Sequence, residues 1–157
     1  MTRTGLICPS RHVNHPGARY CADCGAAMIE GVAGPAEVPC IPPGVLVLDS
    51  GLVVPLDGAC IIGSAAARDA TPLPEPRRKV VVDGDPAIDA VHAELWIDGW
   101  DAYVSDCGSA TGTFMAGDDE GTWVRLPPRE PVPLRGRTLL RLGPSRTLLF
   151  EPRFLPR

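Results

Sequence analysis

Three cysteines and a histidine near the N-terminus have the types and spacing of metal ligands. Three residues separate Cys8 from His12, and Cys21 and Cys24 form a Cys-x-x-Cys pair that is followed directly by glycine. In such a pair two thiolates bind one ion while backbone N–H groups of the turn point at the sulfurs, and the glycine allows a left-handed turn. Four ligands of this kind close a tetrahedral zinc site, which is structural because no coordination position remains open for a reaction.

His15 is an alternative fourth ligand, because both histidines lie within reach of the cysteines. We prefer His12, since it forms the tighter loop with Cys8 opposite the Cys-x-x-Cys turn. A redox role for that pair would need a βαβ context, which the sequence lacks. A unit of about 25 residues cannot bury a core of its own, so metal binding would supply its folding energy. We therefore predict a zinc ribbon over residues 1–30, with zinc as a structural cofactor.

Composition restricts what the rest of the chain can be. The 157 residues include 17 glycines and 18 prolines, which leave little room for long helices. Hydrophobic residues make up 45% of the chain, which is enough for a core, so a helical bundle, a coiled coil and a wholly disordered chain are excluded. No apolar stretch is long enough to span a membrane and no apolar leader precedes the cysteines, so we expect a cytoplasmic protein without a membrane partner. The net charge of -4 argues against broad binding to nucleic acid.

Short apolar runs separated by turn residues predict an all-β fold after the ribbon. Residues 31–43 are rich in Pro, Gly and Ala without periodicity and are interpreted as a linker, and residues 44–157 as a β-sandwich. The clearest signal is Asp98-Gly99 between the runs 93–97 and 100–104, which is typical of a type I′ hairpin. The other expected strands cover 45–48, 52–54, 60–62, 79–82, 113–115, 123–126, 132–134, 138–142 and 147–150.

Four motifs at matching spacing carry a resemblance to a known family. Residues 61–63 (Ile-Ile-Gly) resemble a strand that ends in Gly-Arg, and residues 88–94 resemble Val-Ser-Arg-x-His-Ala-Glu. Residues 104–114 are similar to Asp-x-Gly-Ser-x-Asn-Gly-Thr-Phe, and residues 134–143 to Leu-x-x-Gly-Asp-x-Ile-x-Leu-Gly. Together they resemble the forkhead-associated (FHA) domain, and the ribbon is similar to zinc ribbons fused ahead of FHA domains in actinobacterial proteins. The resemblance implies an eleven-stranded β-sandwich that reads phosphothreonine through loops at one end.

The positions that contact the phosphopeptide in the family hold other residues in this chain. The resemblance implies that two arginines and a serine serve the phosphate and that an asparagine holds the peptide backbone. These positions are Ser64 and Ala90 for the arginines, Asp89 for the serine and Thr111 for the asparagine, and Ser109 belongs to the same loops. Two unit charges at about 4 Å repel by about 4 kcal/mol at a dielectric of about 20. That is half of the roughly 8 kcal/mol behind a micromolar affinity, so we expect the site to be degenerate for phosphate.

The residues that shape the loops, in contrast, match the family. They are Gly63, His92, Gly108, Gly112 and Thr113. The resemblance implies that the histidine braces the binding loops from behind without touching phosphate. Three arginines of the long loop after residue 63 could supply a displaced cation, but we interpret them as solvated charges: Arg68, Arg77 and Arg78.

The sequence therefore predicts a non-catalytic protein–protein interaction adaptor that is independent of phosphate. The alternative is a phosphothreonine reader in Ser/Thr kinase signalling with a different phosphate site. In either case we expect a protein partner, such as a kinase substrate or a larger assembly. A nucleic-acid role for the ribbon is disfavoured because Asp23 and Glu30 offset its arginines and no basic run with aromatics is present. No Ser-His-Asp set, Gly-rich nucleotide loop or paired-carboxylate motif indicates an enzyme.

Overall fold

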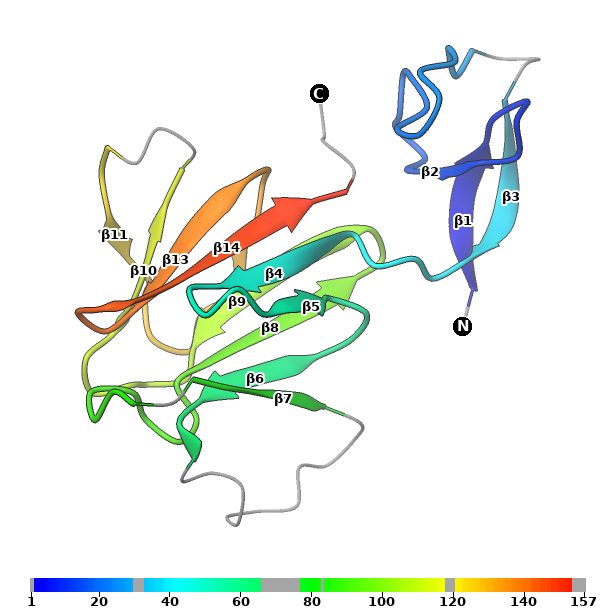
Figure 1. Ribbon diagram of the computed structural model, residues 1–157. Helices are drawn as coiled ribbons and strands as arrows, with labels where there is room; N and C mark the ends of the chain where they lie inside the picture. The colour runs from blue at the N-terminus through cyan, green and yellow to red at the C-terminus, as the bar shows by residue number, and fades with distance from the viewer. Residues whose placement is uncertain (1, 30–32, 66–76, 83, 118–120, 154–157) are drawn as a thin grey trace.

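The computed structural model describes residues 2–29, 33–65, 77–82, 84–117 and 121–153, and its regular elements are β-strands (Figure 1). Two sheets pack face to face as a sandwich, and a separate three-stranded sheet stands beside them at the N-terminus (Figure 1). The expected all-β sandwich is thus confirmed. The described residues contain no helix that could span a membrane.

Eleven strands of the described chain build the sandwich, as expected. The six-stranded sheet has the order β11-β10-β13-β14-β4-β5, and the five-stranded sheet has the order β12-β9-β8-β6-β7. Among these named strands β6 and β7 pair in parallel, and the other pairs are antiparallel. The strands are β4 (Gly44–Leu48), β5 (Val53–Pro55), β6 (Cys60–Gly63), β7 (Arg78–Val81), β8 (Ala93–Asp98), β9 (Asp101–Asp106), β10 (Thr113–Ala116), β11 (Val124–Arg125), β12 (Val132–Pro133), β13 (Thr138–Leu142) and β14 (Arg146–Pro152).

The core lies between the two sheets and follows from the period of two in the strands. In β4 and β13 every second residue is buried, because successive side chains of a strand point to opposite faces. The six-stranded sheet contributes Leu46, Leu140 and Phe150, all almost fully buried. Ile62 and Leu95 meet them from the five-stranded sheet. This packing fixes the two sheets and therefore the loops at their ends.

The hairpin between β8 and β9 turns one residue later than expected. Asp98 pairs with Asp101, so the two loop residues are Gly99 and Trp100 rather than Asp98 and Gly99. Gly99 has a φ of 60°, while Trp100 lies outside the left-handed region. A positive φ at the first loop residue alone is the pattern of a type II′ turn, which requires glycine at that position. The hairpin was therefore predicted in the right place but with the wrong turn, and the shift puts Trp100 at its tip.

The N-terminal sheet consists of β1 (Thr2–Ile7), β2 (Val13–Asn14) and β3 (Gly34–Pro39) in the order β2-β1-β3. Strand β3 falls inside the segment that sequence analysis interprets as a linker, yet all six of its residues pair with β1. Its two prolines argued against a strand, but prolines are tolerated in β3 because it lies at the edge of the sheet. Val38 of β3 is buried, so this segment contributes to the N-terminal sheet.

Trp100 docks the sandwich onto the N-terminal sheet. Its indole Nε1 donates a hydrogen bond to the carbonyl of Thr4 at 2.8 Å, and the Arg3 guanidinium lies 3.6 Å from the indole ring centroid. The ring of His15 meets the indole edge-on, with the centroids 5.6 Å apart. A Cβ at Gly5 would lie 2.9 Å from the indole, so strand β1 has a glycine where Trp100 packs. Cation–π contact, hydrogen bond and close packing together join the two parts.

We expect Trp100→Ala to uncouple the N-terminal sheet from the sandwich. The substitution removes the hydrogen bond and the ring on which Arg3 and His15 pack. ¹⁵N relaxation should show residues of the N-terminal sheet tumbling faster than the sandwich in the variant and together with it in the native protein. Trp96→Ala is the matched control, because Trp96 stacks on Tyr103 within the five-stranded sheet. Equal tumbling of both parts in Trp100→Ala would contradict the docking role.

Candidate functional site

The four predicted metal ligands come together in the N-terminal sheet. Cys8 follows β1, His12 precedes β2, and Cys21 and Cys24 lie in the turn after it. Their ligand atoms all lie within 4.8 Å of one another. The Cys8 Sγ is 3.6 Å from the His12 Nδ1 and 3.9 Å from the Cys24 Sγ. The Cys21 Sγ is also 3.6 Å from the His12 Nδ1.

These distances fit the edges of a tetrahedron around one ion. With metal–sulfur bonds of about 2.3 Å and metal–nitrogen bonds of about 2.05 Å, a tetrahedral site has S···S edges of about 3.8 Å and S···N edges of about 3.6 Å. The three separations given above agree with these edges. Three sulfurs and one imidazole nitrogen are also a common donor set for structural zinc. The cluster is therefore able to bind a metal ion, and its four donors would fill a tetrahedral coordination sphere.

His15, the alternative fourth ligand, takes no part in this cluster. Its Nδ1 accepts the backbone N–H of Gly17 at 2.8 Å, and its ring packs against Trp100. The structure therefore places His12 with the three cysteines and His15 at the contact with the sandwich.

Asn14 is a residue of this site that sequence reasoning missed. Its side chain is fully buried and donates to the Cys21 Sγ at 3.4 Å and to the His12 carbonyl at 3.1 Å. Its Oδ1 accepts the N–H of Ala22 at 2.9 Å, so it links strand β2 to the Cys-x-x-Cys turn. Burial alone would raise the pKa of the Cys21 thiol, but hydrogen bonds from the backbone of Cys24 and from Asn14 lower that pKa to about 6. A thiol of this kind is readily available as a thiolate ligand.

A second group of predicted residues gathers at one end of the sandwich. Three loops meet there: 64–65 after β6, 84–92 before β8, and 107–112 between β9 and β10. Gly63 sets their spacing, because a Cβ on it would lie 1.9 Å from the carbonyl oxygen of Ala90. The N–H of Ser64 donates to the carbonyl of Asp89 at 2.9 Å. Only a residue without a side chain at position 63 permits this backbone contact.

His92 joins two of these loops from inside the protein. The imidazole is fully buried, and its Nδ1 accepts the N–H of Asp89 at 3.2 Å. An acceptor Nδ1 means a neutral ring with its proton on Nε2, which donates to the carbonyl of Gly112 at 2.9 Å. His92 therefore braces the loops with both ring nitrogens and is turned away from solvent.

Asp106 organises the loop 107–112, and sequence analysis did not single it out. Its Oδ2 accepts the N–H groups of Gly108 and Ser109 at 2.9 and 3.0 Å. Its Oδ1 accepts the hydroxyls of Ser109 at 2.5 Å and Thr113 at 2.6 Å. Burial would raise the pKa of Asp106, but these hydrogen bonds outweigh it and hold the pKa below the ordinary range of an aspartate. The position was recognisable in the Asp-x-Gly-Ser part of the motif.

At two of the replaced positions, 89 and 111, the side chain forms a hydrogen bond within the protein. The Asp89 carboxylate accepts the N–H of Ala110 at 2.7 Å, so an anion of the chain itself holds that loop amide. The Thr111 hydroxyl donates to the carbonyl of Ala87 at 2.7 Å. Ala90 has no polar side chain and contributes the carbonyl that faces Gly63. The loops are therefore tied to one another at the positions where the sequence differs from the family.

Two of the three arginines considered as displaced cations form ion pairs with carboxylates of the chain. Because β6 and β7 are parallel, Arg77 and Arg78 stand beside the start of β6, whereas the loops follow its end. Arg77 pairs with Glu94 at 3.1 Å. Arg78 pairs with Asp57 at 3.0 Å. Arg68 lies outside the described residues.

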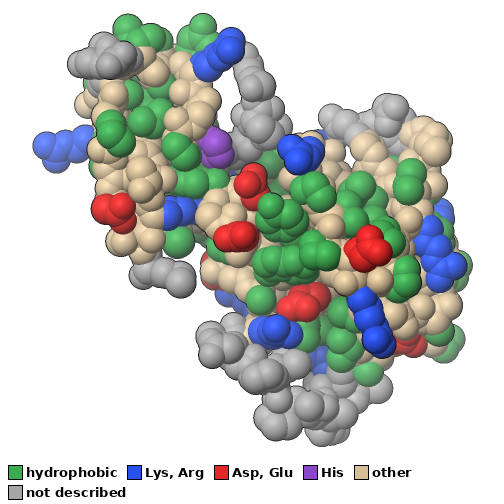
Figure 2. Space-filling view, turned by 180° about the vertical axis from the view of Figure 1, so that it is seen from behind, with side chains coloured by type: hydrophobic (Ala, Val, Ile, Leu, Met, Phe, Trp, Pro, Cys, Tyr) green, Lys and Arg blue, Asp and Glu red, His purple; other side chains and the backbone are tan. Residues whose placement is uncertain are grey.

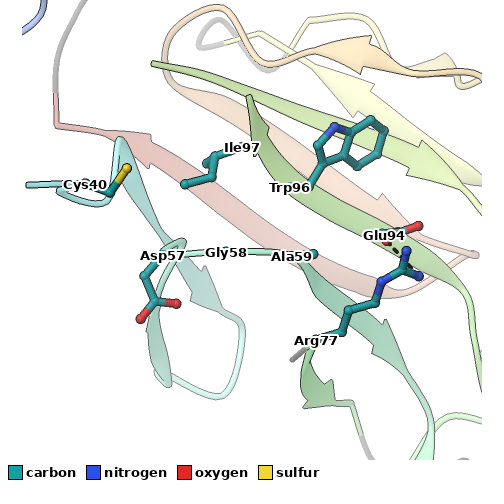
Figure 3. Close-up of a pocket in the computed structure, with 8 residues that line it drawn as sticks. All are labelled: Cys40, Asp57, Gly58, Ala59, Arg77, Glu94, Trp96 and Ile97. Carbon is teal, nitrogen blue, oxygen red and sulfur yellow. Dashed lines mark ion pairs between the residues drawn. The ribbon is translucent and has the colours of Figure 1, made fainter. Parts of the chain in front are cut away.

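A groove of about 560 Å³ lies at this other end of the five-stranded sheet (Figure 3). Figure 3 shows the paired side chains of Arg77 and Glu94 along it. Arg77 and Glu94 are thus engaged with each other and Asp57 with Arg78, and the groove contains none of the predicted site residues. It is lined by Cys40, Asp57, Gly58, Ala59, Arg77, Glu94, Trp96 and Ile97.

Comparisons with known proteins agree on one fold. The family model of the FHA domain matches residues 60–143. The FHA domain of an Arabidopsis thaliana hypothetical protein has a TM-score of 0.54 and 18% identity, covering 79% of this chain and 97% of that one. The MEK1 FHA domain in complex with the HOP1 pThr318 peptide has a TM-score of 0.51 and 21% identity, covering 71% of this chain and 98% of that one. Mycobacterium tuberculosis EmbR in complex with a low affinity phosphopeptide has a TM-score of 0.51 and 17% identity, covering 73% of this chain and 25% of that one. No curated protein matches in sequence.

We expect Asp106→Asn to destabilise the sandwich at neutral pH by about 1–3 kcal/mol, since it disturbs a buried set of hydrogen bonds. The folded pKa of Asp106 lies below its unfolded value of about 3.9, so its contribution is complete above that pH. The contribution is lost as the pH falls through the lowered folded pKa. Urea unfolding at several pH values should show a gap between native and variant that narrows in acid.

Asp101→Asn on the exposed start of the same strand is the matched control and should be nearly neutral. A stability gap for Asp106→Asn that is absent at pH 7, or that stays constant into acid, would contradict the assigned role.

Proposed function

Because the chain belongs to the FHA domain family, we propose that it is a non-catalytic protein-interaction module whose binding loops no longer depend on phosphate. The FHA domain is a phosphothreonine-binding interaction module, and the loops that carry this function are assembled here. The proposal concerns what these loops bind. The observation that carries it is the hydrogen bond from the Ala110 N–H to the Asp89 carboxylate.

The charge at the site supports a partner without phosphate. A phosphothreonine carries nearly two negative charges and needs cations and free donors. At the positions that serve phosphate in the family, this chain offers an alanine, a serine and the carboxylate of Asp89. That carboxylate repels an anion and holds the amide of Ala110. A peptide that places neutral groups beside Asp89 faces no such repulsion.

The phosphothreonine reader remains the competing function. Among the structures similar to this chain, the MEK1 FHA domain is in complex with the HOP1 pThr318 peptide and EmbR with a low affinity phosphopeptide. For this chain to do the same, another cation would have to replace the missing arginines. Arg77 and Arg78 pair elsewhere, which speaks against them in that role.

We expect the native protein to show no phosphate-dependent binding in fluorescence anisotropy against phosphothreonine peptides and their unphosphorylated counterparts. The combined variant Ser64→Arg, Asp89→Ser, Ala90→Arg and Thr111→Asn should gain phosphate-dependent binding, because it restores two cations and removes the opposing charge. Circular dichroism checks that the variant remains folded. A native protein that prefers the phosphorylated peptides would contradict the proposal.

We further propose that the N-terminal sheet is a zinc ribbon that spans residues 1–30 together with β3, followed by a short linker and the FHA sandwich to residue 157. The distances within the Cys8, His12, Cys21 and Cys24 cluster support zinc. When bound, zinc supplies folding energy to a sheet with little core of its own. The protein's contribution is to orient the ligands through Asn14 and the turn that holds Cys21 and Cys24.

We expect one zinc per chain by mass spectrometry of the metal, and its loss in Cys24→Ser and His12→Ala. Cobalt substitution should give the absorption of a tetrahedral thiolate site. His15→Ala and Cys40→Ser are matched controls that should keep the metal, because neither residue belongs to the cluster. Loss of zinc in His15→Ala with retention in His12→Ala would overturn the ligand assignment.

The proposed partner is a protein, such as a Ser/Thr kinase substrate or a larger assembly, and the proposed location is the cytoplasm. Figure 2 shows basic and acidic side chains interspersed on the face seen from behind, rather than one continuous basic stripe. Nucleic-acid binding depends on such a stripe. The distribution of charge on this face therefore favours a protein partner over a nucleic acid.

A further inference from the structure

Two arginines that the predicted site does not include lie against the loop 107–112. A Cβ on Gly112 would be 2.7 Å from the Nε of Arg125, and a Cβ on Gly108 would be 3.2 Å from the Nε of Arg129. Arg125 comes from β11, and Arg129 follows it in a segment that bonds to the Asp106 carbonyl through its own N–H at 2.7 Å. The two glycines therefore make room for two guanidinium groups on the loop surface.

A third arginine, Arg141, shares with Arg125 one face of the six-stranded sheet. The Arg141 guanidinium lies 4.8 Å from the ring centroid of Phe114 and 4.6 Å from that of Trp123. Phe114 pairs in register with both Arg125 and Arg141, so the three side chains share one face. The guanidinium of Arg125 also lies over the Phe114 ring, at 6.0 Å. Aromatic faces position these cations without neutralising their charge.

The charges of this group are not satisfied inside the described part of the protein. None of the ion pairs among the described residues involves Arg125, Arg129 or Arg141. The Arg141 Nε is buried without a hydrogen-bond partner in the described structure. Arg125 and Arg129 are exposed, while Arg141 is half-buried. We call Arg125, Arg129, Arg141, Phe114 and Trp123 the arginine–aromatic surface.

We propose that the arginine–aromatic surface binds an acidic, unphosphorylated segment of a partner protein through Asp or Glu carboxylates. The inference rests on the proposed function and names the chemistry of its partner. Guanidinium groups bind carboxylates through paired N–H donors, and Arg with aromatic residues is the composition of binding hot spots. The Ala110 amide already donates to Asp89, whereas Arg125 and Arg129 are exposed cations that lie against the same loop. Together with Arg141 they form a positively charged group on a chain whose net charge is -4.

The test is a titration of the ¹⁵N-labelled, metal-loaded full chain with a short unphosphorylated peptide of alternating Glu and Ala. Amide shifts should occur at Gly108 and Gly112 and at the indole of Trp123. In anisotropy, the double variant Arg125→Gln and Arg129→Gln should bind the peptide at least about tenfold more weakly, since two charge-assisted contacts are lost.

Arg19→Gln with Arg135→Gln is the matched control, because it removes two exposed charges away from the loop and should bind as the native protein does. Absence of binding, shifts confined to residues 64 and 89–90, or equal affinity of the double variant would each overturn the inference. These outcomes leave the proposed function standing, since the restored-site variant tests it separately. Binding of a phosphothreonine peptide but not of the Glu–Ala peptide would overturn both.

Discussion

The buried carboxylate of Asp106 is the contact on which the binding end of this protein depends. It accepts the N–H groups of Gly108 and Ser109 and the hydroxyls of Ser109 and Thr113. A buried charge is costly unless its lone pairs are satisfied, and these donors satisfy them. The turn fixed in this way presents Ala110 to Asp89, offers the Gly112 carbonyl to His92 and provides the surface on which Arg125 and Arg129 lie. The contacts that loop 107–112 makes with Asp89, His92 and the two arginines therefore depend on this carboxylate.

The loops and the contact with the N-terminal sheet lie at opposite ends of the sandwich. Ala93 pairs with Asp106 at the end with the loops, whereas Trp100 stands at the opposite tip of the same hairpin and docks the N-terminal sheet. The N-terminal sheet, which carries the metal-ligand cluster, thus contacts the sandwich through Trp100 at the end opposite the loops. The FHA fold thus carries the Asp89 carboxylate on the amide of Ala110, and Arg125 and Arg129 lie on the neighbouring surface of the same loop.

Sequence reasoning predicted what depends on local pattern. Short apolar runs bounded by turn residues predicted strands β4 and β13, and the spacing of Cys8, His12, Cys21 and Cys24 predicted a cluster that the structure assembles. The features that it missed depend on contacts between distant residues. Strand β3 forms because its residues pair with β1, whereas its prolines led to its interpretation as a linker. Nothing local in the sequence shows that Trp100 meets Thr4, or that Arg125 lies on Gly112. The turn at Gly99 was displaced by one residue because strand pairing rather than the Asp-Gly signal sets the register.

The most direct test of phosphate-independent binding is affinity capture with the full, metal-loaded protein from lysate of the cells that make it. The capture is run in parallel on untreated lysate and on lysate treated with a protein phosphatase. The account predicts the same specific partner in equal yield from both, because the Asp89 carboxylate holds the loop amide and opposes a phosphate. A partner that is recovered from the untreated lysate and lost after phosphatase treatment would contradict it.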